Sequence, residues 1–211
     1  VTAQKQAEAE LIREHDRSRS IINASPTIVC GLDPDGMTNY INLTGEKLTG
    51  YSTSELLGRS WWDIFYPGDE YAQVEKLYQH FKTGDVRDYE MTLTTKAGEK
   101  KIVSWSSVKQ FDKDGKLIQI IGFGSDVTEK KRAERRLNAQ HAVTGVLAES
   151  PNLDEAIRKI IQTICENLDW QEGAVWNMDA KAGVLRCADI WHKPSDCMKE
   201  FIDATRRVTF K

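Results

Sequence analysis

Apolar and polar positions along the first 130 residues follow two different periods. Short β-branched or aromatic runs with a period of two predict five strands, near residues 27–32, 37–41, 89–94, 101–108 and 116–125. Between the second and third strands, glycines interrupt short helical turns, and a longer helix is expected to about residue 82. Two strands, several small helices and a three-stranded meander predict an α+β domain with an antiparallel sheet over residues 21–128.

Helical spacing dominates the rest of the chain. Residues 1–20 carry a thin apolar stripe in a charged background, which predicts a linker helix that needs a partner. Residues 129–150 read as a connecting helix whose first half is too polar to be buried. After Pro151 a strongly amphipathic helix, a hairpin and another helix are expected, so residues 151–211 form a separate segment.

The fifth predicted strand runs into the charged helix without a loop. Asp126 is expected to cap this helix, with Glu129 three residues on, because carboxylates are stabilised by the free N–H groups and the dipole at a helix start. A strand joined directly to a long helix can pass strain from a sheet to whatever the helix drives. We therefore expect Asp126, Val127 and Thr128 to relay a signal.

Composition narrows the function classes. The 211 residues carry 29 basic and 32 acidic side chains, a net charge of −3, so no global basic field favours nucleic acid. The four cysteines are scattered, which favours a reducing cytoplasm, and no apolar run approaches the length of a membrane span. The sequence has no Walker loop, no metal-ligand cluster and no G-x-S-x-G motif, so an enzyme is the least favoured class.

Four stretches of the sequence together resemble a PAS domain, in the order found in that family. They are 42–52 (NLTGEKLTGYS), 58–70 (GRSWWDIFYPGDE), 96–105 (KAGEKKIVSW) and 126–134 (DVTEKKRAE). The last resembles the family's Asp-Ile-Thr signature, with Val127 in place of isoleucine. The resemblance implies a five-stranded antiparallel sheet flanked by small helices, a ligand pocket between them, and an output through the C-terminal helix.

The resemblance also allows two cofactors to be tested. Light-sensing relatives carry a flavin-reactive cysteine where this chain has Trp61, after Gly58-Arg59-Ser60, which argues against a flavin photoadduct. In haem-binding relatives the proximal histidine corresponds to Gln73 here, which argues against haem. The identity of any cofactor or ligand stays open.

A pocket, if present, is expected to use aromatic and small side chains of this domain. Gly122 and Gly124 share one face of their strand, and either that face points inward and leaves room for a ligand, or it points outward and lets a partner approach. An ordinary filled aromatic core is the alternative. The candidate lining residues are Cys30, Trp61, Phe65, Tyr78, Met91, Trp105, Gly122 and Gly124.

Residues 138–211 resemble the first half of a GAF domain in the order helix, helix, hairpin, helix. A complete domain of that kind needs more strands, so we expect residues 151–211 to be an incomplete GAF-like segment. The chain starts at Val1, and we expect it to be a piece of a longer signalling protein that carries an output domain, such as a histidine kinase or cyclase, and that could be membrane-anchored. Two hypotheses follow. The first is a sensory module that senses a small ligand or a partner and dimerises through residues 1–20 and 128–149. The second is a cofactor-free dimerisation scaffold with a filled core.

Overall fold

The computed structural model describes residues 2–72, 74, 76–77, 85–194 and 198–210. The chain divides into two compact units, residues 1–128 and 129–211. The elements of the first unit are α1 (Thr2–Ala24), β1 (Ile28–Leu32), β2 (Thr38–Ile41), α2 (Leu43–Thr49), α3 (Thr53–Leu56), α4 (Trp61–Phe65), the 3-10 turn η1 (Gly68–Glu70), β3 (Tyr89–Thr94), β4 (Lys100–Phe111) and β5 (Leu117–Asp126).

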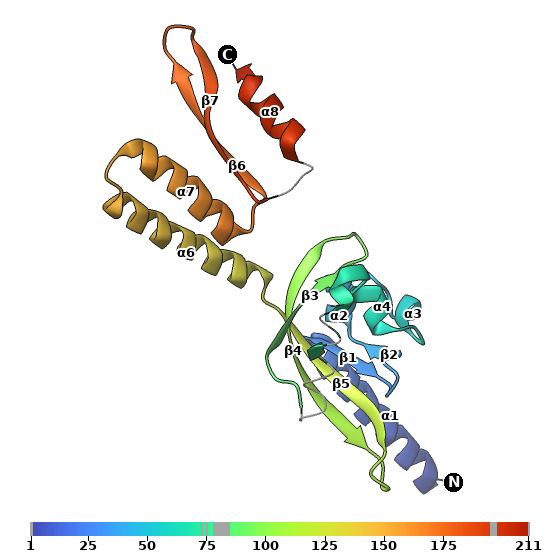
Figure 1. The fold of residues 1–211 in the computed structure, drawn as a ribbon. Helices are drawn as coiled ribbons and strands as arrows, with labels where there is room; N and C mark the ends of the chain where they lie inside the picture. Colours follow the sequence, from blue (N-terminus) through green and yellow to red (C-terminus); the bar gives the residue numbers. More distant parts are fainter. Residues whose placement is uncertain (1, 73, 75, 78–84, 195–197, 211) are drawn as a thin grey trace. The chain divides into compact units, whose positions relative to one another are not determined.

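The five strands form one antiparallel sheet in the order β2-β1-β5-β4-β3. The prediction of an α+β domain with a five-stranded antiparallel sheet is confirmed. The last strand of the sequence, β5, lies in the centre of the sheet, between β1 and β4 (Figure 1). Helices α2, α3 and α4 gather on one side of the sheet (Figure 1). Strand β5 therefore runs along the middle of the sheet, and it ends two residues before the end of this unit.

The core of this unit fills the space between the sheet and the small helices. Trp61, Phe65 and Tyr66 contribute its aromatic part from α4 and the residue after it, and each is at most 2% exposed. Ring contacts join Trp61 to Phe65 at 4.4 Å and to Trp105 of β4 at 5.7 Å between centroids. Aromatic pairs of this kind add to the stability that apolar burial alone provides.

Helix α1 ends four residues later than predicted, at Ala24 instead of residue 20, because a buried side chain holds its end. The Asn42 amide group donates to the carbonyl oxygens of Ile22 and Thr27, and its oxygen accepts from the backbone N–H groups of Val29 and Gly45. Carbonyl groups in the last turn of a helix need partners from outside the helix. Asn42, which is fully buried, supplies one and joins α1 to β1 and α2.

An exposed ion pair fastens α3 to the β3–β4 turn. Lys96 binds the Glu55 carboxylate, which also accepts hydrogen bonds from the N–H and hydroxyl groups of Ser52. The bond from Lys96, followed by those from Ser52, lowers the pKa of Glu55 to about 2. A carboxylate with a depressed pKa in the folded state stabilises the fold above its unfolded pKa, and this contribution is lost as the pH falls through the folded pKa.

We expect NMR to detect this pairing. The side-chain carboxyl carbon of Glu55 should titrate with a midpoint near 2, against an ordinary value of 4.5. Replacing Lys96 with Gln removes the largest cause of the shift, so the pKa of Glu55 should rise. A midpoint near the ordinary value in the unmodified chain would show that the pair does not persist in solution.

The second unit is built on two helices and a hairpin. Its elements are α6 (Thr128–Glu149, which starts on the last residue of the first unit), α7 (Leu153–Leu168), β6 (Glu172–Asp179), β7 (Val184–His192), α8 (Lys199–Arg207) and β8 (Thr209–Phe210). Helices α6 and α7 lie side by side, with residues such as Val143 and Ile164 lining one shared groove, and α7 also packs on the β6–β7 hairpin (Figure 1). A Cβ atom on Gly173 would lie 2.6 Å from the Cys165 sulfur, so the lack of a side chain there permits the close approach of α7. Within the described ranges, no helix is both long and apolar enough to cross a lipid bilayer.

Candidate functional site

A small cavity of about 40 Å³ lies inside the sheet domain, above the centre of the sheet. Three small residues form its floor in a row across the central strands, because Ser107 of β4 pairs with Gly122 of β5, and Gly122 pairs with Cys30 of β1. A hydroxyl, a hydrogen atom and a thiol occupy positions where larger side chains would fill the core. The pairing of β4, β5 and β1 brings these three small residues together and so creates the space.

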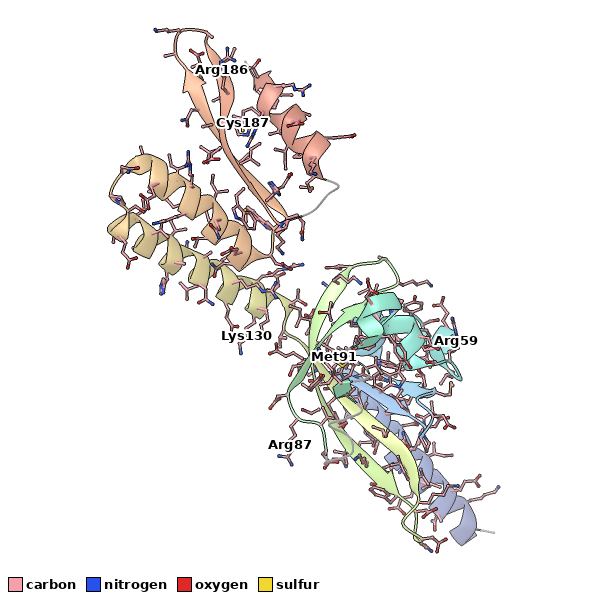
Figure 2. The ribbon with its side chains drawn as sticks, viewed as in Figure 1. Arg59, Arg87, Met91, Lys130, Arg186 and Cys187 are labelled. Atoms are coloured by element: carbon pink, nitrogen blue, oxygen red, sulfur yellow. The ribbon has the colours of Figure 1, made fainter. Side chains whose placement is uncertain are left out.

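Apolar side chains form the walls of the cavity. Met91 lies on β3 within the domain, whereas Arg87, just before that strand, and Arg59 point away from it (Figure 2). The residues around the cavity are Cys30, Leu32, Trp61, Trp62, Leu77, Val86, Met91, Trp105, Ser106, Ser107, Ile120 and Gly122. No charged side chain is among these described lining residues.

The structure brings five of the eight candidate lining residues to this cavity, namely Cys30, Trp61, Met91, Trp105 and Gly122. Phe65 is a correction: it is fully buried, but it packs between Trp61 and Tyr51 and does not reach the cavity. Tyr78 lies outside the described residues.

Gly124 is the second correction. Gly122 and Gly124 of β5 face inward, so the first of the two orientations considered for this strand is the observed one. The space above Gly124 is nevertheless filled. A Cβ atom at Gly124 would lie 2.6 Å from Cζ3 of Trp105, so the indole ring occupies the space that the missing side chain leaves. The ring is held there because its Nε1–H donates to the Tyr66 hydroxyl at 3.0 Å.

Ser107 is the residue that the sequence analysis missed. It is 9% exposed, and its hydroxyl has no hydrogen-bond partner among the described residues. The neighbouring Ser106 hydroxyl accepts from the N–H of Asp88, and the Ser107 N–H donates to the carbonyl of Val86, so the segment before β3 is held at the rim of the cavity. The period of two places Ser107 on the same face as Trp105, and that signal could have identified it.

Cys30 is a buried thiol. Burial raises its pKa to about 12, and a hydrogen bond from the backbone of Gly122 opposes the shift only in part. A thiol with such a pKa is protonated at neutral pH and is a poor nucleophile. Cys30 thus contributes a small, neutral and weakly polar surface to the cavity floor.

The junction after β5 is a second organised site. The Ile102 N–H donates to the Thr128 hydroxyl oxygen at 2.9 Å, and the Val127 N–H donates to the Ile102 carbonyl at 2.9 Å. Thr128 is 3% exposed. These two bonds extend the β4–β5 ladder beyond the end of β5, and they attach the first residue of α6 to β4.

Asp126 has a different position from the one expected. It is the last residue of β5, and its carboxylate accepts from the Thr128 N–H at 2.9 Å. Glu129 does not reach back toward it as in a reciprocal cap, because its carboxylate pairs with Arg132 and Arg136 of α6. The Asp126 carboxylate still satisfies a free N–H group, that of Thr128, at the start of α6.

Sequence comparison agrees with this architecture. Residues 26–129 match the profile of the PAS domain family. These residues are a PAS domain. The match contains all five strands, the cavity and the junction, so both candidate sites belong to the PAS domain.

Several signalling proteins resemble part of this chain. The aerobic respiration control sensor protein ArcB of Escherichia coli is 30% identical over 119 residues, which cover 56% of this chain and 15% of ArcB. The two-component sensor PprA of Pseudomonas aeruginosa is 26% identical over 149 residues, which cover 71% of this chain and 16% of PprA. The chain thus spans about 15% of the length of these relatives.

Among solved structures, the PAS domain of an HTR-like protein from Haloarcula marismortui aligns with a TM-score of 0.47 and 23% identity. The alignment covers 58% of this chain and 98% of that domain.

The large cofactors of some PAS relatives do not fit the described cavity. Haem and flavin rings are far larger than a space of about 40 Å³. Trp61, which the family resemblance aligns with the flavin-reactive cysteine, is 2% exposed and forms part of the wall. Gln73, which the resemblance aligns with the proximal histidine, lies outside the described residues. Those residues also contain no group of three or more His, Cys, Asp and Glu side chains arranged to hold a metal ion.

Proposed function

We propose that this chain is a sensory input module whose PAS core senses a small ligand and transmits its state through Asp126, Val127 and Thr128 to α6. PAS domains are in general non-catalytic sensory modules, and similar domains occur in the sensors ArcB and PprA. The observation that carries the proposal is that β5 contributes Gly122 to the cavity and continues directly into the junction. One strand therefore connects a space in the core with the start of a long helix.

The hydrogen bonds of Ile102 support the second half of this proposal. Both of its backbone polar groups are used by the junction, one by Thr128 and one by Val127. A shift of β5 relative to β4 would have to break or displace these bonds. The junction can thus convert a change in the sheet into a change at the first turn of α6.

We expect Thr128→Val to loosen the junction. Valine has the shape of threonine but lacks the oxygen that accepts from the Ile102 N–H, so a part-buried donor is left unpaired at a cost of about 1–3 kcal/mol. Hydrogen exchange measured by NMR should become faster at the Ile102 amide and in the first turn of α6.

Thr144→Val is the matched control, because Thr144 is exposed on α6 and its hydroxyl only donates to the Gln140 carbonyl. Exchange at Ile102 should be unchanged in this variant. Equal exchange at Ile102 in the unmodified chain and in Thr128→Val would contradict the relay.

One observation favours the alternative of a cofactor-free scaffold. The Trp105 indole fills the space above Gly124, and the cavity that is left has only about 40 Å³. A scaffold would show no ligand response at the junction and would still dimerise. The ligand titration described below separates the two functions.

Both functions include a homodimer formed through the helices. Leu11 of α1 and Leu137 and Leu147 of α6 are 72%, 52% and 53% exposed, which leaves apolar positions available to a second copy.

We further propose that the helices and hairpin of residues 151–211 are a GAF-like segment, and that an output domain in the same protein receives the signal.

A further inference from the structure

We propose that the PAS cavity binds a neutral molecule of three or four non-hydrogen atoms with one hydroxyl group, such as a short-chain alcohol, and that Ser107 holds this hydroxyl. The inference rests on the proposed function, because it names the ligand class of the same cavity.

The size of the cavity sets the number of atoms. A cavity needs about 10–15 Å³ to hold one water molecule. The space of about 40 Å³ therefore holds three or four atoms of water size. Such a volume admits ethanol or propanol.

The polarity of the walls sets the chemistry. A buried water needs two to four polar partners. The Ser107 hydroxyl lacks a partner among the described residues, whereas the Ser106 hydroxyl is already engaged with Asp88. The remaining surface is mainly apolar, from residues such as Trp105 and Met91. A molecule with one hydroxyl and a short apolar body satisfies Ser107 and these walls together, which water alone does not.

The charge of the ligand follows from the neighbours of the cavity. None of the described lining residues is charged, and the Arg87 side chain beside Val86 points away from the domain (Figure 2). The Cys30 thiol is neutral at physiological pH because burial raises its pKa. An ionic ligand would lose its hydration without gaining a counter-charge, so a neutral one is favoured.

The test is an NMR titration of the full 211-residue chain with three probes: ethanol, 1-propanol and xenon. Xenon reports the apolar space alone, because dry apolar cavities bind it. We expect each probe to shift the amide signals of Ser107, Gly122 and Cys30. Ser107→Ala should weaken both alcohols by about fivefold to tenfold, the loss of one hydrogen bond, and leave xenon affinity unchanged.

Two further variants complete the test. Gly122→Ala should abolish binding of all three probes, since its Cβ would lie 2.9 Å from the Cys30 sulfur and fill the space. Ser125→Ala, an exposed serine of the same strand, should leave all three affinities unchanged. Xenon binding in Ser107→Ala also verifies that this variant keeps its cavity.

Three results would overturn the inference: equal alcohol affinity in Ser107→Ala, binding of xenon without either alcohol, or no response to any probe. Exchange at Ile102 and α6 is recorded in the same samples. Alcohol binding without any change there would keep the ligand class and refute the relay. A loosened junction in Thr128→Val without alcohol binding would refute the ligand class and leave the relay intact.

Discussion

Replacing Asn42 with Ala is expected to destabilise the PAS domain by about 4 kcal/mol, counting about 1–2 kcal/mol for each of two fully buried donors and less for the two part-buried carbonyls. Asn42 is completely buried, and its side chain makes all four hydrogen bonds that an amide can make here. It also caps α2 through the N–H of Gly45. Alanine would leave the Val29 and Gly45 N–H groups without their partners.

Urea unfolding followed by tryptophan fluorescence measures this effect, because four tryptophan and tyrosine side chains lie in the same core (Trp61, Trp62, Tyr66 and Trp105). Asn39→Ala is the control. Its side chain is exposed and, among the described residues, accepts one long hydrogen bond, from Gln119, so its loss should cost less than about 0.5 kcal/mol. Equal midpoints for the two variants would refute the role of Asn42.

Asn42→Asp tests the donors separately from the acceptors. The introduced carboxyl can still accept from Val29 and Gly45, but when ionised it faces the carbonyl oxygens of Ile22 and Thr27 without a proton. Burial raises the folded-state pKa of such a carboxyl, so the protonated form is favoured. This variant should therefore be most stable below the unfolded pKa of aspartate, about 3.9, and lose stability as the pH rises through the folded pKa.

Gly124→Ala is expected to destabilise the domain by about 2–3 kcal/mol, the upper part of the range of about 1–3 kcal/mol for overfilling a packed core. The added Cβ would lie 2.6 Å from Cζ3 and 2.8 Å from Cη2 of Trp105. The indole cannot move away freely, because it donates to Tyr66 and meets the Trp61 ring edge to face at 86°. The change should also shift the fluorescence maximum of Trp105.

Gly145→Ala, which also replaces glycine with alanine, is expected to change stability in the opposite direction. Gly145 lies within α6, and a Cβ there would meet nothing within 4 Å. Alanine is a better helix former than glycine by about 0.5–1 kcal/mol, so this variant should be neutral or more stable.

A double-mutant cycle tests whether Trp105 is the cause of the Gly124 effect. Phenylalanine lacks the outer ring atoms that the new Cβ would meet. The cost of Gly124→Ala should therefore be smaller in a Trp105→Phe background than in the unmodified chain. Strictly additive costs would show that the strain lies elsewhere.

Most of the fold could be predicted from local pattern. The alternation in residues 101–108 and 116–125 identified β4 and β5. The boundaries were less well predicted at α1, which extends to Ala24. A residue 20 positions further along, Asn42, binds the Ile22 carbonyl and supports that end, and such a long-range contact has no local signal.

The candidate site was predicted in its composition but not in its arrangement. Aromatic and small residues on the correct strands indicated the cavity, yet Phe65 and Gly124 proved to be packed against rings. The alternation of β4 could have placed Ser107 on the same face as Trp105, but it gives no sign of whether the serine hydroxyl finds a partner. That depends on what lies across the sheet, here Gly122.

By itself, then, the sequence determined the elements: strand period, turn chemistry and the direct passage from β5 into α6 are properties of neighbouring residues, set by backbone sterics and side-chain alternation. Only the tertiary structure decided which way the glycines of β5 face, and that Trp105 fills the space above one and leaves the space above the other. The physical reason is that volume in a core belongs to several strands at once. Ser107, Gly122 and Cys30 form one cavity floor only after β4, β5 and β1 have paired.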